Sequence, residues 1–114
     1  MSKSYRQINQ DQRELGRAYR QASPDTFNAF LGLHQAAMKD GALSTKHKEL
    51  IATAISIACR CDGCIASHVA SAIKAGAGRE ELIETIDVAI LMGGGPSLIY
   101  GVQARAVVDE LLGA

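Results

Sequence analysis

Tryptophan is absent from the sequence, and only two phenylalanines and three tyrosines occur among its 114 residues. An excess of charge of either sign is also missing, because twelve basic and twelve acidic residues cancel to a formal net charge of zero. Nucleic-acid-binding domains usually combine a basic surface with accessible aromatic side chains. The composition therefore argues against a nucleic-acid partner.

Long apolar runs are missing as well. No stretch approaches the roughly 20 consecutive apolar residues that a membrane-spanning helix needs. The first residues, from Met1 to Arg6, are mostly polar and lack the apolar run of a secretory signal. We therefore expect a cytoplasmic protein with no membrane partner. In that compartment cysteines serve catalysis or metal binding more often than they stabilise a fold as disulfides.

Cysteine is scarce, with three residues, and an odd number argues against a disulfide framework. A chain of this length is expected to form one domain, 1–114, that buries roughly two-thirds of the surface exposed by its unfolded chain. Apolar residues are plentiful at 47%, but 18 residues of the chain are alanines. Small apolar side chains favour helices that approach closely, and we expect such a protomer to gain further core in an obligate or near-obligate homo-oligomer.

The apolar positions repeat at helical spacing, and no alternating strand pattern exceeds four residues. We therefore predict an all-α, single-domain bundle of six helices after a loose segment at residues 1–8. The expected helices cover about 9–21, 24–39, 45–60, 64–75, 79–92 and 96–112, with Asp62 or Gly63 separating the third from the fourth. Cys59 and the Leu and Ile stripes are assigned to the core. In the last two helices these stripes are Leu82, Ile83, Ile86, Ala89, Ile90 and Leu91, then Leu98, Ile99, Val102, Ala106 and Leu111.

The stretch with the most chemical character is Cys61-Asp62-Gly63-Cys64, followed by His68. Residues three and seven positions apart share a helix face, so both thiols and the imidazole can lie together. If a helix begins near Asp62, Cys64 lies in its first turn, where unpaired N–H groups favour a thiolate. His68, one turn later, can accept the thiol proton. Gly63 permits a tight turn that brings Cys61 within disulfide reach, which completes the minimum set for dithiol–disulfide chemistry.

Glu49 is a less obvious member of this set. It stands near the polar start of a helix that then becomes almost wholly apolar. The carboxylate can fold back beside His68, orient the imidazole and raise its basicity, as the third member of a triad does. The alternative is an acid of the first helical turn that the helix dipole favours.

The cysteine pair also has two less reactive interpretations. Cysteine is among the most buried residue types, so both residues can be inert packing. Zinc usually requires four ligands. Cys61, Cys64 and His68 supply three, and the fourth would be Cys59, His47 or Glu49.

No cofactor is expected from the sequence. The run Gly93-Gly94-Gly95 lacks the preceding strand and the following Lys-Ser/Thr of a phosphate-binding loop, so it is interpreted as a connector between helices. His34 and His47 are interpreted as ordinary surface or core histidines.

Three segments of the chain carry a resemblance to a known family. They are Leu43-x-x-Lys46-x-Lys48-Glu49-Leu50-Ile51, Cys61-x-x-Cys64-x-x-x-His68, and Ala75-Gly76-Ala77 with Glu80-Glu81-Leu82. Over roughly Phe27 to Leu112 the sequence resembles the carboxymuconolactone decarboxylase / alkylhydroperoxidase D-like (AhpD-like) family. The resemblance implies an all-helical fold, homo-oligomers that are commonly trimers or hexamers built from dimers, and peroxidase or disulfide-reductase activity through the cysteine pair.

Residue by residue, the resemblance implies that Cys64 is the thiol that attacks peroxide and that Cys61 resolves the product. His68 with Glu49 would form the proton relay. The characterised alkylhydroperoxidase D proteins have a histidine where this chain has Gly63, so one relay member is missing here.

The sequence therefore predicts a thiol-dependent oxidoreductase that acts on a hydroperoxide or a disulfide and is regenerated by an external thiol reductant. Two alternatives stay open. One is a non-enzymatic oligomeric module that senses redox state or binds metal, and the other is a cofactor-free, decarboxylase-like enzyme with His68 as its base.

Overall fold

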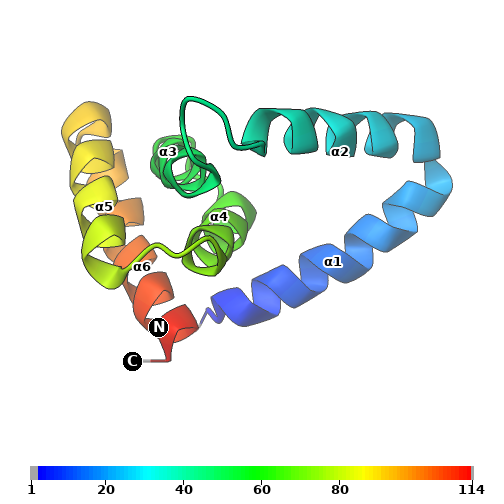
Figure 1. Cartoon of the computed structure of the whole chain (residues 1–114). Helices are drawn as coiled ribbons and strands as arrows, with labels where there is room; N and C mark the ends of the chain where they lie inside the picture. The colour runs from blue at the N-terminus through cyan, green and yellow to red at the C-terminus, as the bar shows by residue number, and fades with distance from the viewer. Residues whose placement is uncertain (1–2, 114) are drawn as a thin grey trace.

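The computed structural model describes residues 3–113, and these form six α-helices joined by short connections (Figure 1). Residues 3–113 contain no β-strand. The predicted all-α class and the six helices are thus confirmed. No helix in this described range is both long and apolar enough to cross a membrane. The helices are α1 (Tyr5–Ala22), α2 (Pro24–Met38), α3 (Thr45–Ala58), α4 (Asp62–Lys74), α5 (Arg79–Gly93) and α6 (Gly95–Leu112).

The core lies among α3, α4, α5 and α6, and both α3 and α6 contact each of the other three helices (Figure 1). Apolar side chains from all four helices are fully buried there, which is the main source of stability in such a bundle. The prediction of a central third helix is confirmed, although Ile51 and Ile55 on its outer side are about half exposed. The largest buried side chains of these helices are Ile57, Ile65, Val69, Leu82, Val107 and Val108.

Helices α1 and α2 form an arm that stands away from this core. Figure 1 shows α1 running outward from the end of α6 and α2 returning toward α3. Along its whole length α2 has no buried residue.

The start of α1 anchors the arm. Tyr5 is 1% exposed, and its hydroxyl lies 3.0 Å from Asp62 Oδ1 and 3.2 Å from Gln103 Oε1. The prediction of a loose segment at residues 1–8 is wrong for residues 5–8, which form the first turn of α1. A buried tyrosine with hydrogen-bond partners fixes this turn, and the polar sequence around it gave no sign of that. Met1 and Ser2 lie outside the described residues.

The connection between α5 and α6 depends on its glycines. Gly94 has a φ of 70°, which other L-residues rarely adopt. A Cβ atom on Gly93 would lie 1.8 Å from Ser97 Oγ, so any side chain there would collide with the next helix. The interpretation of Gly93–Gly95 as a helix connector is confirmed.

The predicted core stripe of α6 is wrong at three positions. The large apolar side chains of Leu98, Ile99 and Val102 are about half exposed, and Leu91 at the end of α5 is 78% exposed. Small residues let α6 approach α5 closely, since a Cβ on Gly101 would already lie 3.0 Å from Ile90 Cδ1. The face that α6 buries consists of Ser97, Gly101, Ala104, Val107 and Val108.

Candidate active site

The turn between α3 and α4 places the first cysteine. Helix α3 ends at Ala58, and the chain reverses at Arg60, whose φ of 56° is in the left-handed region. Cys61 is extended and caps α4, with its Sγ accepting a hydrogen bond from the Cys64 N–H at 3.2 Å. The predicted break at Asp62 or Gly63 is therefore wrong by about two residues.

Cys59 is exposed and is a free thiol, so its assignment to the core is also wrong. The reason is local: α3 has ended, and Cys59 is the residue that caps its carboxyl end in the connecting turn. A helical periodicity extended through this position would place the side chain on the wrong surface.

Cys61 and Cys64 are joined by a disulfide, with their Cα atoms 5.2 Å apart. Both residues are partly exposed. Cys64 lies in the first turn of α4, as predicted, where free backbone N–H groups and the helix dipole stabilise an anionic sulfur once the pair is reduced. The predicted redox partners are thus within bonding distance, and this structure shows their oxidised form.

His68 and Glu49 meet across α4 and α3. His68 Nδ1 lies 2.7 Å from Glu49 Oε1, and the Glu49 side chain is only 5% exposed. Glu49 belongs to the second turn of α3, so the interpretation as a first-turn acid does not apply. A buried carboxylate requires such a partner. Because Nδ1 is engaged, Nε2 is the ring nitrogen left to exchange a proton.

A second histidine lies beside this pair. The rings of His34 and His68 are stacked, with centroids 6.3 Å apart and planes inclined by 28°. His34 is exposed on α2, and the sequence interpretation treated it as an ordinary histidine. Its spacing from Phe27, Phe30 and Leu31 did place it on one face of α2. The position of His34 on this apolar face is the sequence feature that could have linked it to the site.

A cavity of about 910 Å³ opens between the arm and α4. Cys61, Cys64 and His68 all line it, and so does His34. The two sulfurs and the imidazole therefore face one common space that is large enough for a small organic molecule.

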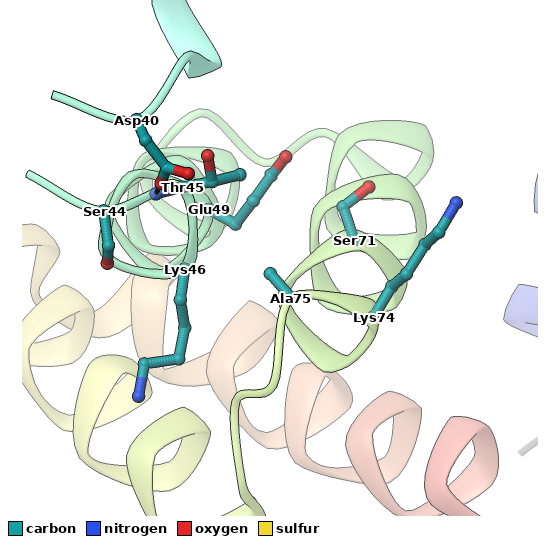
Figure 2. A pocket seen from close by; sticks show the side chains of 8 residues that line it. All are labelled: Asp40, Ser44, Thr45, Lys46, Glu49, Ser71, Lys74 and Ala75. Atoms are coloured by element: carbon teal, nitrogen blue, oxygen red, sulfur yellow. Dashed lines mark hydrogen bonds between the residues drawn. The ribbon is translucent and has the colours of Figure 1, made fainter.

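A second, smaller cavity of about 520 Å³ lies on the other side of Glu49 (Figure 2). Figure 2 shows Glu49 reaching from α3 toward the part of α4 that carries Ser71, with Lys46 and Lys74 farther out. Ser71 lines both cavities. The Glu49–His68 pair thus lies between two cavities, only the larger of which contains the cysteines.

Comparison with known proteins places this arrangement in a family. The sequence profile of the carboxymuconolactone decarboxylase family matches residues 24–107, which include both cysteines, His68 and Glu49. The chain belongs to the carboxymuconolactone decarboxylase family. The resemblance drawn from the three sequence segments is confirmed.

Solved structures and curated relatives agree with this assignment. A carboxymuconolactone decarboxylase family protein from Legionella pneumophila is 43% identical, with a TM-score of 0.91 over 94% of this chain and 96% of that one. A Thermotoga maritima member with a suggested part in the antioxidative response is 29% identical, with a TM-score of 0.82 over 94% and 91% of the two chains. An uncharacterized protein of Cupriavidus necator is 41% identical over 87% of each chain.

Gly63 is where this member of the carboxymuconolactone decarboxylase family departs from the alkylhydroperoxidase D pattern. A Cβ on Gly63 would lie 3.8 Å from Gln12 Cγ of α1, an ordinary contact distance. The arm therefore covers the position at which a histidine side chain would begin. His68, hydrogen-bonded to Glu49, remains as the group of the site that can exchange a proton.

An ion pair neutralises the first turn of α4. Asp62 accepts a hydrogen bond from the Lys3 ammonium, which holds the pKa of Asp62 below its usual value. Partial burial opposes this effect, and a hydrogen bond from the Tyr5 hydroxyl adds to it. Burial first, and then the bond to Asp62, raise the pKa of Tyr5. Asp62 is therefore an anion with a cation beside it, so its charge next to the cysteines is compensated.

Metal binding was the other use considered for these side chains. Between residues 3 and 113, no three His, Cys, Asp or Glu side chains are grouped so that they could hold a metal ion.

Proposed function

We propose that this family member is a thiol-dependent oxidoreductase that reduces a hydroperoxide or a small disulfide in the cytoplasm. The observation that supports this best is the Cys61–Cys64 disulfide, which lines one cavity with a histidine bonded to a buried glutamate. Family membership and the suggested antioxidative role of the Thermotoga maritima relative point the same way.

The first step starts from the reduced pair. His68, one helical turn beyond Cys64 and oriented by Glu49, accepts the Cys64 proton, and the thiolate attacks the distal peroxide oxygen. The O–O bond breaks as the S–O bond forms. The leaving alkoxide takes the proton from His68 and departs as an alcohol, and Cys64 is left as a sulfenic acid.

The second step closes the disulfide seen in the structure. The Cys61 thiol loses its proton and attacks the Cys64 sulfur, an S–S bond forms as the S–O bond breaks, and the leaving hydroxyl takes that proton and departs as water. An external dithiol then reduces the pair through a mixed disulfide and is itself oxidised. For a disulfide substrate, attack by Cys64 gives a mixed disulfide instead of a sulfenic acid, and Cys61 resolves it in the same way.

The decisive experiment counts free thiols in the reduced protein before and after one equivalent of an organic hydroperoxide. The proposal predicts a fall from three thiols to one, with Cys59 remaining free. A stoichiometric loss of peroxide should accompany this change. A thiol count that stays at three while peroxide persists would contradict the proposal.

Substitution of single cysteines assigns the roles. Cys64→Ser should abolish peroxide consumption, because no other thiol is both in the cavity and in the first turn of α4. Cys61→Ser should allow one oxidation and accumulate a sulfenic acid that dimedone labels. Cys59→Ser is the matched control and should keep full activity, since this thiol lies outside the cavity lining. Full turnover by Cys64→Ser would show that the attacking thiol has been misassigned.

A further inference from the structure

One face of α1 forms a wall of the cavity that contains the disulfide. Each lining residue of this helix follows the previous one at a spacing of one or three, which is the pattern of a single helical face. Three of the six are arginines. The set is Asn9, Gln12, Arg13, Gly16, Arg17 and Arg20.

These arginines have no acidic partner. Within residues 3–113, none of Arg13, Arg17 and Arg20 forms an ion pair, although other basic residues such as Arg79 do. No aspartate or glutamate lines the cavity. Three like charges along about two helical turns repel one another, and an anion in the cavity would relieve that repulsion. A chain with no net charge thus concentrates positive charge at this one wall.

The α1 wall begins beside the reactive sulfurs and runs away from them. At its inner end, Gln12 lies beside Gly63, and Asn9 Nδ2 donates a hydrogen bond to the Ala66 carbonyl at 3.0 Å. With a rise of 1.5 Å per residue, Arg17 lies roughly 7.5 Å and Arg20 roughly 12 Å beyond Gln12 along the helix axis. A ligand that reacts at the disulfide and extends along α1 therefore meets the guanidinium groups one to two helical turns away.

The opposite wall is apolar. Phe27, Phe30 and Leu31 of α2 line the same cavity, and Phe30 is 66% exposed. An inorganic anion would gain nothing from these side chains, whereas a hydrocarbon chain would bury its surface against them. The cavity thus combines an apolar wall, a basic wall and a redox pair at one end.

We infer that the substrates of this site are amphipathic carboxylates, namely hydroperoxides of long-chain carboxylic acids. The inference rests on the proposed function for its chemical step. The carboxylate binds Arg17 and Arg20, the hydrocarbon chain lies along α2, and the mid-chain hydroperoxide reaches Cys64. The thiolate takes the distal oxygen, the O–O bond breaks, and the proton from His68 yields the hydroxy acid with its carboxylate unchanged.

Binding is tested without any catalysis. Isothermal titration calorimetry of the disulfide form should show that decanoate binds at least about tenfold more tightly than 1-decanol, because charged hydrogen bonds distinguish the two. The preference should shrink as salt is raised. Equal binding of acid and alcohol, or no binding of decanoate, would overturn the inference.

Variants then assign the preference to the arginines. In Arg13→Gln/Arg17→Gln/Arg20→Gln, decanoate should bind about tenfold or more weakly, and Gln preserves helix propensity. Arg17→Lys should retain more affinity than Arg17→Gln because it keeps the charge. Arg105→Gln removes the same charge from an exposed pair outside the cavity and should leave decanoate binding unchanged. Wild-type affinity in the triple variant would contradict the assignment.

Turnover separates this inference from the proposed function. The ratio of kcat/KM for linoleic acid hydroperoxide to that for its methyl ester should exceed about ten in the wild type and fall toward one in the triple variant. Arg105→Gln should keep the wild-type ratio. If neither hydroperoxide is consumed but decanoate binds through the arginines, the anion site stands and the peroxidase proposal fails. If both are consumed equally, the peroxidase stands and the substrate class is wrong.

Discussion

Glu49 shows how burial and chemistry are linked at a single residue. Its side chain is 5% exposed, and its Oε1 lies 2.7 Å from Nδ1 of the His68 imidazole. Removing a carboxylate from water is costly unless a donor or a cation compensates it. An inert core would favour an apolar side chain here, so the charge is better explained by its effect on His68.

Replacing Glu49 by Gln should separate this effect from stability. Glu49→Gln keeps the shape and a hydrogen bond but cannot stabilise a protonated His68, so the rate of peroxide-driven disulfide formation should fall roughly 100-fold. KM should change little, because Glu49 does not line the cavity that holds the cysteines. Stopped-flow measurement of the oxidation step gives both parameters.

Two controls keep the role of Glu49 distinguishable from a structural one. Glu49→Asp retains the charge and should recover part of the rate. Glu84→Gln makes the same chemical change at an exposed position of α5 and should leave the rate unaltered. The melting temperature of Glu49→Gln should equal or exceed that of the wild type, since a buried charge is removed. A slow but markedly less stable Glu49→Gln would instead indicate a structural role.

The sequence predicted some of these residues and missed others for physical reasons. The pairing of Cys61 with Cys64 followed from their spacing at a helix start. The contact of Glu49 with His68 was one of two interpretations that the sequence left open, and the family resemblance implied it. The stacking of His34 on His68 depends on how the arm folds back, which no local pattern encodes. Arg13, Arg17 and Arg20 lie at helical spacing in the sequence, but nothing in the sequence indicated that a cavity would lie against them.

Among the helices, the connection between α3 and α4 is the element that determines where the disulfide lies. Arg60 occupies the left-handed region with a φ of 56°, where a side chain costs roughly 1–2 kcal/mol. Sequence rules placed the break at Asp62 or Gly63, because Gly is the usual residue for such a position. Cys59 and Arg60 carry no turn signal, so the boundary was predicted about two residues too late.

Arg60→Gly should stabilise the protein by about 0.5–1 kcal/mol. Glycine removes the local strain but loses more conformational freedom on folding, which offsets part of the gain. Urea unfolding of the oxidised protein measures the difference. Arg60→Ala removes the same side-chain atoms but keeps the Cβ, so it should show no such gain. Stabilisation by Ala as large as by Gly would point to the arginine charge and not to the backbone.

The packing of α6 shows why side-chain size alone misled the core prediction. Leu98, Ile99 and Val102 are the bulky residues of the helix, yet its buried face is built from smaller ones such as Gly101 and Ala104. Close approach of α5 and α6 decides which face is inside. That approach is a property of the pair of helices and cannot be read from either one.

On the scale of the whole molecule, the exposed bulky residues form a pattern of their own. Leu91 and Met92 at the end of α5 are each 78% exposed, and Leu33 of α2, which does not line the disulfide cavity, is 63% exposed. Adjacent large apolar side chains that are this exposed, such as Leu91 and Met92, are typical of surfaces that contact another protein chain. The composition predicted an oligomer for an independent reason, the abundance of small apolar residues. We propose that these surfaces are covered by further copies of the chain.

A charged side chain in place of Leu91 should test this assembly. Full burial of a side chain the size of Leu91 in an interface contributes about 1.5–3 kcal/mol to the free energy of association. Leu91→Glu should therefore weaken self-association and leave the helix content of the protomer intact. Sedimentation velocity at micromolar concentration should show an oligomer for the wild type, a trimer or hexamer by family resemblance, and smaller species for the variant.

Gln10→Glu adds the same charge at an exposed polar position of α1 and should leave the wild-type species unchanged. A wild type that sediments as a monomer would contradict the proposal, and the exposed side chains would then need a different partner. Loss of peroxide turnover together with the oligomer would further show that the arm needs a neighbouring copy to hold the disulfide cavity open.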